Sequence, residues 1–215
     1  MLSFIFTDAD IPSNVLKSLL KKAAANSFNA ITVDSDTSTN DMVSIFSTKK
    51  IKTLQNKTIS DPLIQKFEIH LKKLCLNLAK QIVVDGEGAK KFVTVKILNA
   101  KSQLSAKKIA FSIANSPLVK TAIAGEDPNW GRIIMGIGKS GEFIDKEKFT
   151  IKFGDLSVAE KGKISPDYDE GKLREYMKWD SISIEINLNL GSDTFECYTC
   201  DFTHDYVDIN ADYRN

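Results

Sequence analysis

The sequence predicts a mixed α and β fold, and three patterns support this class. Apolar residues alternate at positions 2–6, as they do in a strand. Two segments, 11–28 and 62–78, repeat apolar residues every three or four positions, as amphipathic helices do. Residues 182–190 alternate strictly between apolar and polar side chains, which is typical of a strand with one face in water.

The first strand and the first helix have the clearest patterns of the N-terminal part. Leu2, Phe4 and Phe6 alternate, and Ile5 is apolar on the opposite face, which favours a strand covered on both sides. The helix over residues 11–28 then presents one broad apolar face. That face comprises Ile11, Val15, Leu19 and Ala23, flanked by Leu16, Leu20 and Ala24.

Shorter elements complete this part of the chain. A strand over residues 30–33 leads into the polar run 34–40. A second helix begins at Pro62 and is followed by a short strand over residues 82–84, and residues 92–98 form a further strand. The apolar face of the second helix is predicted to consist of Leu63, Phe67, Leu71, Leu74 and Leu78.

The C-terminal part begins with helices and continues with strands. Residues 105–124 are predicted to be helical with an interruption near Pro117, and residues 133–137 form a short helix. From Phe149 onward the pattern is mostly β. Residues 191–193 are predicted to turn the alternating strand back into a hairpin.

The length of 215 residues fits one large domain or two small ones. There is no internal repeat, and no linker is long enough to separate independent domains. We therefore place a soft boundary that divides the chain into residues 1–91 and residues 92–215.

Composition excludes several classes of protein. The chain has 29 Lys and Arg against 28 Asp and Glu, so its net charge of +1 excludes a general electrostatic attraction to nucleic acid or to an acidic membrane. No stretch approaches the ~18 apolar residues of a membrane span. Three Cys make a disulfide framework unlikely to form and fit a reducing, cytoplasmic compartment.

Two short segments partly match the sequence motifs of known ligand sites, but each lacks a residue or a structural context that the motif requires. The run 34–40 resembles the start of a calcium loop, but Thr39 and Ile45 stand where the loop needs Gly and Glu. A polar pocket lining at this run stays open. Residues 136–141 match a dinucleotide fingerprint, yet a helical pattern precedes them in place of the required strand.

A third motif, Cys197-Tyr-Thr-Cys200, invites a metal or redox interpretation. Residues three apart on a strand point to opposite faces, so the two thiols do not converge. No second Cys pair completes a zinc site. We therefore predict buried structural cysteines and no metal site.

Two features favour a binding site. Glu87 lies between Gly86 and Gly88 directly after an apolar strand, and glycines permit the close approach of a ligand to the backbone. The residues alone leave a capped turn and an ammonium-binding carboxylate equally open. The final segment, 204–215, carries Tyr206, Val207 and Ile209, which predicts a tail docked through apolar anchors.

Four long segments together resemble one known family. They read SFNAITVDSDTSTNDM, IVVDGEGAKKFVTV, SPLVKTAIAGEDPNWGRI and DYVDINADYR, and they follow one another in the family's order. On these segments the whole chain resembles the β-chain of ornithine acetyltransferase, the glutamate N-acetyltransferase of arginine biosynthesis. The fold that this implies is an α+β, layered α/β sandwich completed by an α-chain, with a mixed α/β C-terminal part.

The resemblance implies a nucleophile outside residues 1–215 of this chain. Family members cut their own precursor before a Thr, within Ala-Thr-Met-Leu, and that Thr becomes the nucleophile. Because this chain starts Met1-Leu2, we expect the Thr one position before Met1 and assign no catalytic residue within residues 1–215. The implied reaction moves acetyl from N-acetylornithine to the Thr and then to glutamate.

The resemblance also implies the binding residues and the partners. Family substrate contacts fall on Glu87 and Asn210, and less directly on Asn215, where the family commonly has Thr. The α-chain of the same precursor supplies the oxyanion donors, and the implied assembly is α2β2. We expect residues 1–91 to adjoin the nucleophile and the tail of residues 92–215 to return to the active site. No cofactor is implied, and the sequence leaves open whether acetyl-CoA serves as an alternative acetyl donor.

Two other functions remain open. One is a related self-cleaving aminopeptidase or amidase, in which water replaces glutamate as the acceptor. The other is a catalytically inactive chain that only completes a heteromer.

Overall fold

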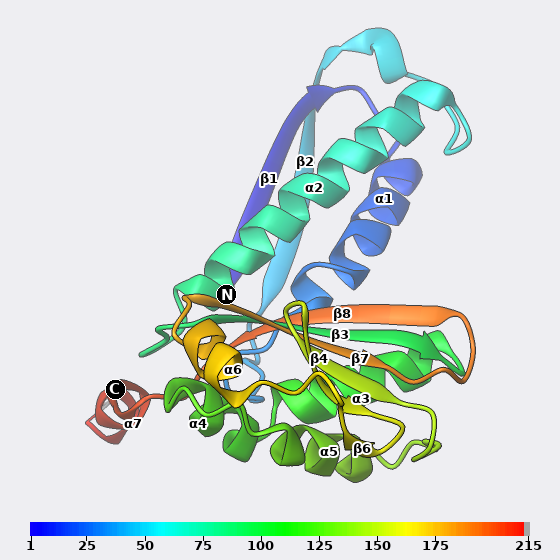
Figure 1. The fold of residues 1–215 in the computed structure, drawn as a ribbon. Coiled ribbons are helices and arrows are strands. Elements are labelled where there is room, and N and C mark those ends of the chain that lie inside the picture. Colours follow the sequence, from blue (N-terminus) through cyan, green and yellow to red (C-terminus); the bar gives the residue numbers. More distant parts are fainter. Residues whose placement is uncertain (213–215) are drawn as a thin grey trace. The chain divides into compact units, whose positions relative to one another are not determined.

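The computed structural model describes residues 1–212, which divide into two compact units (Figure 1). The first unit comprises residues 1–30 and 36–80, and the second comprises residues 31–35 and 81 onward. Each unit has its own sheet and its own covering helices. No helix among the described residues is both long enough and apolar enough to cross a membrane.

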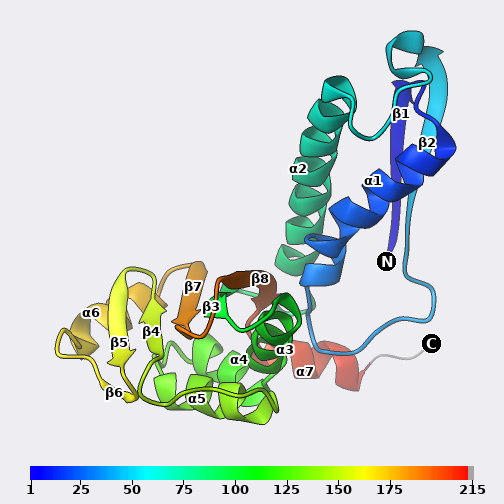
Figure 2. The same ribbon diagram turned by 90° about the vertical axis from the view of Figure 1, so that its right-hand side faces the viewer.

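The first unit is a two-stranded parallel sheet with helices on one side. Strand β1 (Leu2–Ala9) pairs with β2 (Met42–Ile51), and the register places Ile5 opposite Ile45. Helices α1 (Ser13–Ala25) and α2 (Pro62–Val84) both lie on the same side of this pair (Figure 2). Two short 3₁₀ turns, η1 (Phe28–Ala30) and η2 (Lys52–Leu54), connect these elements.

The apolar core of the first unit confirms the predicted face of α1 and corrects that of α2. Leu19 of α1 is fully buried. On α2, Leu63 and Leu74 are exposed, whereas their neighbours Ile64 and Cys75 are fully buried. Leu71 lies in the core and Phe67 and Leu78 pack against it, as predicted, so the correction is limited to a one-position shift at Leu63 and Leu74. The core consists of Ile5, Ala9, Ile11, Val15, Leu16, Leu19, Ala23, Leu54, Ile64, Leu71 and Cys75.

Within the first unit, the helices cover one face of strand β1. Ile5 points toward the helices and is 6% exposed, whereas Phe6 on the other face is 70% exposed. Phe6 stacks on Phe46 of β2, with ring centroids 5.2 Å apart. Helices α1 and α2 lie on one side of the β1–β2 pair, and among the described residues of the first unit no element covers the other side.

The second unit is built on a six-stranded mixed sheet with the order β6-β5-β4-β7-β3-β8. Its strands are β3 (Phe92–Ala100), β4 (Thr150–Phe153), β5 (Leu156–Glu160), β6 (Lys163–Ile164), β7 (Ser181–Asn187) and β8 (Asp193–Cys200). Helices α3 (Gln103–Ala114), α4 (Pro117–Ala124) and α5 (Trp130–Lys139) lie together on one face of the sheet (Figure 1). The remaining helices are α6 (Glu170–Met177) and α7 (His204–Ala211).

The predicted hairpin over residues 182–200 is wrong, because β3 lies between β7 and β8. Val95 of β3 pairs in parallel with Ile184 on one side and antiparallel with Cys197 on the other. The intervening turn bonds to the end of β3, since Leu190 and Gly191 both donate backbone N–H groups to the carbonyl of Asn99. Strand β3, whose residues alternate between buried and half-buried, thus lies where the turn sequence predicted a direct β7–β8 contact.

Other elements of the second unit match the sequence or correct it locally. The interruption near Pro117 separates α3 from α4, with Pro117 in the first turn of α4. Residues 30–33 form no strand, and only Ile31 makes an isolated parallel bridge, to Tyr198. Residues 82–84 belong to α2, where Val83 is buried at helical spacing from Ala79. Branched residues had favoured a strand there, and packing overrides that preference.

Candidate active site

Glu87 lies in the turn that follows α2, so a helix and not the expected strand precedes it. Gly88 in this turn has φ of +67°, a left-handed backbone that favours glycine. A Cβ atom at Gly88 would lie 2.5 Å from the backbone nitrogen of Tyr206. Gly88 therefore lets the backbone of α7 approach the turn that carries Glu87.

Two residues expected at the site meet in the second unit. The side-chain amide of Asn210 donates a hydrogen bond of 2.7 Å to the Glu87 carboxylate and a second bond of 2.9 Å to the carbonyl of Tyr206. Both Glu87 and Asn210 are exposed, so a ligand from solvent can reach them. The third expected residue, Asn215, lies outside the described residues.

Helix α7 is held against the turn by polar contacts and one aromatic stack. Thr203 donates its hydroxyl to the carbonyl of Gly88 at 2.7 Å, and the Tyr206 hydroxyl donates to Asp34 at 3.1 Å. The Tyr206 ring stacks on Phe202, with centroids 4.6 Å apart. An exposed ion pair of 2.9 Å joins Lys90 to Asp205, and it raises the pKa of Lys90.

The tail is docked, but the prediction that Val207 and Ile209 anchor it is wrong. Val207 is 60% exposed and Ile209 is also exposed, and no residue of α7 is buried. Tyr206 is the half-buried member of the three and makes the contacts described above. On the short helix α7, the side chains of Val207 and Ile209 face solvent.

A buried carboxylate lies under the turn, and sequence reasoning missed it. Asp201 is 2% exposed, and its Oδ1 accepts bonds of 2.9 Å from the backbone N–H groups of Lys90 and Lys91. These bonds fix the chain that leaves the Glu87 turn. An Asp directly after an apolar strand was the available signal, but a single sequence does not identify the groups that such an Asp contacts.

The calcium-like run 34–40 and the Cys197–Cys200 motif belong to no cluster of metal-binding side chains among residues 1–212. No group of three His, Cys, Asp or Glu side chains in this part of the chain is close enough to hold an ion. Cys197 and Cys200 are free and buried, as predicted, and burial raises the pKa of both thiols. Asp34, from the polar run 34–40, contributes to the site through its contact with Tyr206.

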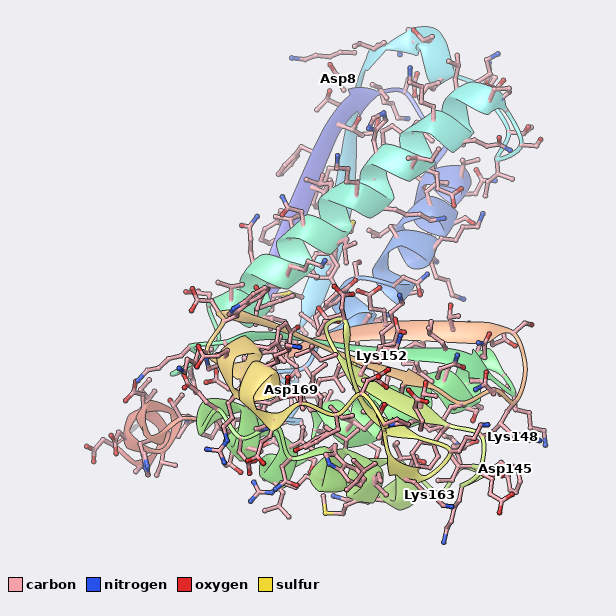
Figure 3. The ribbon with its side chains drawn as sticks, viewed as in Figure 1. Asp8, Asp145, Lys148, Lys152, Lys163 and Asp169 are labelled. Carbon is pink, nitrogen blue, oxygen red and sulfur yellow. The ribbon has the colours of Figure 1, made fainter. Side chains whose placement is uncertain are left out.

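Charged groups elsewhere on the second unit are remote from this site. Figure 3 labels Asp145 and Lys148, which form an exposed pair at 3.2 Å, at the opposite end of the unit from α7. The same figure labels Lys163 and Asp169, which also project from other elements of the unit. Asp145 and Lys148 therefore serve as controls for substitutions at the site.

The arrangement suits recognition of a small cationic group. The carboxylate of Glu87 is accessible, and the amide of Asn210 orients it by a hydrogen bond. An ammonium group donates strong, charge-assisted hydrogen bonds to such a carboxylate. Neither side chain is a strong nucleophile, so the geometry fits binding better than covalent chemistry.

Comparison with known proteins decides the family. The model of the ArgJ family matches residues 1–215. The chain belongs to the ArgJ family. Among curated ArgJ relatives, the arginine biosynthesis bifunctional protein ArgJ of Gluconobacter oxydans is 48% identical over 215 residues, and that of Mesorhizobium japonicum is 50% identical over 218 residues. Each alignment covers the whole chain but only 51% and 53% of those ArgJ proteins.

A crystal structure of ArgJ from Bacillus halodurans has the same fold. Its TM-score is 0.93 at 40% identity, over 99% of this chain and 100% of that chain. The mixed α+β class is therefore confirmed. The chain spans about half the length of the curated ArgJ relatives that it matches, as one chain of a processed ArgJ enzyme would.

Proposed function

We propose that this chain is the β-chain of an ArgJ glutamate N-acetyltransferase that transfers acetyl from N-acetylornithine to glutamate. The observation that carries the proposal is the hydrogen bond between Glu87 and Asn210. These two residues were assigned to the substrate by resemblance alone, and they lie far apart in the sequence. Their contact, together with membership of the ArgJ family, supports a shared binding role.

The proposed chemistry has two steps. The hydroxyl oxygen of a Thr one position before Met1 attacks the acetyl carbonyl of N-acetylornithine, while the α-amine of that Thr takes the hydroxyl proton. The C–N bond breaks, ornithine leaves with a proton on its nitrogen, and an acetyl ester remains. The amine of glutamate then attacks the ester and regenerates the Thr hydroxyl.

Glu87 and Asn210 serve this reaction by holding the amino acid part of the substrate. Departing ornithine and incoming glutamate both carry an α-ammonium group, which suits the Glu87 carboxylate. Asn210 orients that carboxylate from α7. The site thereby places the α-amine of the acceptor, which must lose its proton before it attacks.

The α-chain of the same precursor is the proposed partner, within an α2β2 assembly. The uncovered face of the β1–β2 pair presents apolar side chains that single soluble proteins bury. These exposed side chains are Leu2, Phe4, Phe6, Met42 and Phe46. A partner chain that supplies the missing half of the relatives' length would cover them and bring the oxyanion donors.

The three free cysteines fit the reducing interior in which an amino acid biosynthetic enzyme works, so we propose a cytoplasmic location. No cofactor is required by the proposed reaction. Whether acetyl-CoA serves as an alternative acetyl donor is tested by supplying it in place of N-acetylornithine.

The decisive experiment replaces Glu87 with Gln in the assembled enzyme, expressed with its α-chain. Gln keeps the shape and removes the charge, so kcat/KM for acetyl transfer to glutamate should fall by about 10- to 150-fold, as expected for the loss of a charged hydrogen bond of ~1.5–3 kcal/mol. Asp145→Asn is the control and should leave kcat/KM unchanged, since Asp145 is remote and exposed.

Three outcomes would contradict the proposal. Wild-type kinetics in Glu87→Gln with a lowered melting temperature would reduce Glu87 to a turn-capping residue. Release of free acetate without acetylglutamate would favour the amidase alternative, and an assembled protein without either product would favour an inactive chain.

A further inference from the structure

Lys120 is a buried cation that the proposed reaction does not use. It is the charged residue of α4, and it is 1% exposed, which makes it one of the largest fully buried side chains of the described chain. Removing an ammonium group from water is costly unless hydrogen bonds and opposite charge replace the water. The buried ammonium group of Lys120 therefore needs hydrogen-bond acceptors or a negative charge beside it.

The partners of Lys120 are three residues at the end of β8 and just beyond it, Thr199, Cys200 and Phe202. Its Nζ donates a bond of 2.7 Å to the hydroxyl of Thr199 and another to the carbonyl of Cys200. It also lies 4.6 Å from the centroid of the Phe202 ring, a distance that suits a cation–π contact. The two segments are also joined through their backbones, because the N–H of Phe202 donates to the carbonyl of Lys120.

Asp201 lies within this same segment and connects it to the Glu87 turn. Its Oδ1 accepts the backbone N–H groups of Lys90 and Lys91, while its Oδ2 is buried and has no hydrogen-bond partner in the described part of the chain. A buried carboxylate of this kind is stabilised by a nearby cation. Burial lowers the pKa of Lys120, and the charges of Cys200 and Asp201 oppose that shift.

A continuous set of contacts thus runs from α4 to the substrate-binding carboxylate. Lys120 fixes residues 199–202, Asp201 fixes residues 90 and 91, and Thr203 fixes the carbonyl of Gly88 next to Glu87. The first residues of α7 follow the same segment, and α7 carries Asn210. Both members of the Glu87–Asn210 pair are therefore anchored to the segment that Lys120 holds.

We propose that Lys120 is a positioning residue for Glu87. Its buried ammonium group fixes the β8–α7 junction, and the junction sets the position of the Glu87 carboxylate against Asn210. The inference rests on the proposed function, because the effect of Lys120 on activity passes through substrate binding at Glu87. A residue that only stabilises the fold would lower the melting temperature without depending on Glu87.

The test is a double-mutant cycle in the assembled enzyme, with Lys120→Met, Glu87→Gln and the double variant. Met keeps most of the length of the Lys side chain and removes the charge. Lys120→Met should raise KM for glutamate by about 5-fold or more, with a smaller change in kcat. In the double variant, kcat/KM should be no lower than in Glu87→Gln alone, because the interaction that Lys120 supports is already lost. Lys148→Met is the matched control and should leave KM unchanged.

If kcat/KM of the double variant falls by the product of the two single-variant factors, Lys120 and Glu87 act independently. That result would overturn the inference and leave the proposed function standing. Wild-type kinetics in Glu87→Gln would overturn both. If Lys120→Met does not assemble, the cycle is run with Thr199→Val, which removes one acceptor of Lys120 and keeps the side-chain shape. An unchanged KM for glutamate in Thr199→Val, or multiplicative effects with Glu87→Gln, would equally overturn it.

Discussion

The amide of Asn210 donates a 2.7 Å hydrogen bond to the carboxylate of Glu87 across 123 positions of sequence. Neither residue is buried, so the contact is maintained by the elements that carry it. Glu87 stands in a glycine turn after α2, and Asn210 stands on α7. The pair therefore depends on how α7 is docked, and several predictions concern that docking.

Asn210→Ala should lower kcat/KM for acetyl transfer by about 2- to 10-fold, since it removes one neutral donor at ~0.5–1.5 kcal/mol from the Glu87 carboxylate. The comparison is made by steady-state kinetics on assembled enzyme. Asp208→Ala, also exposed on α7, is the control and should retain full activity. Equal losses in the two variants would show that α7 tolerates no change at all and would remove the specific role of Asn210.

Gly88→Ala should weaken the docking of α7 and raise KM. A Cβ at this position would lie 2.5 Å from the backbone nitrogen of Tyr206, and the backbone has φ of +67°. Gly138→Ala in α5 is the matched control, because a Cβ there meets nothing within 4 Å and Ala favours a helix by ~1 kcal/mol. Melting temperature and KM are measured for both, and an unaffected KM in Gly88→Ala would refute the prediction.

Phe6→Ser should weaken assembly with the α-chain. Phe6 is exposed and stacks on Phe46, on the face of the β1–β2 pair that the described residues of the first unit leave uncovered. Size-exclusion chromatography of the co-expressed chains should show less heteromer and more free chain. Phe143→Ser, which removes an equally exposed Phe from the second unit, should leave assembly intact. A similar loss from both variants would argue against a specific interface.

Alkaline pH should destabilise the protein through its buried thiols. Burial raises the pKa of Cys197 in the folded state, so the folded chain keeps a proton that the unfolded chain loses above pH ~8.5. The stability that results is complete below that pH and is lost as the pH rises further. Melting temperatures between pH 7.5 and 10 should fall less steeply for Cys197→Ala than for the wild type. Parallel curves would contradict the assignment.

Chelators should leave the acetyl transfer rate unchanged, and the assembled enzyme should need no nucleotide. The calcium-like and dinucleotide-like motifs each lack a required residue or context, and the proposed reaction uses only the Thr and the two substrates. Rates are compared before and after dialysis against EDTA. Activity that disappears and returns with one added divalent metal would disprove this prediction.

Local periodicity predicted most helices and strands, and it failed where several solutions had the same pattern. The strictly alternating β7 and the Pro117 interruption are determined by neighbouring residues, so they were predictable. The order of strands was not, because a Gly-Ser-Asp turn fits either a hairpin or a turn that passes over a third strand. The missed helical end of α2 has the same cause, since Ile82-Val83-Val84 suits either a strand or a buried helix face.

The candidate site was predictable only in part. Resemblance to a family assigned Glu87 and Asn210, whose contact no spacing rule could predict. Lys120 of α4 and Asp201 after β8 were missed because a single charged residue in or beside an apolar element gives no sign of what it faces. Their roles depend on contacts between segments far apart in the chain, which a single sequence does not specify.

The place of β3 between β7 and β8 has a consequence for the speed of folding. Its two neighbours, β7 and β8, come much later in the chain, so the sheet closes only after long loops have been ordered. Chains dominated by such distant pairings fold slowly, and helices form well before them. Because Asp201 and α7 follow directly after β8, the Glu87 turn reaches its final geometry only when β8 has paired with β3. During refolding of the assembled enzyme, the helical circular dichroism signal should therefore recover before the ability to bind glutamate.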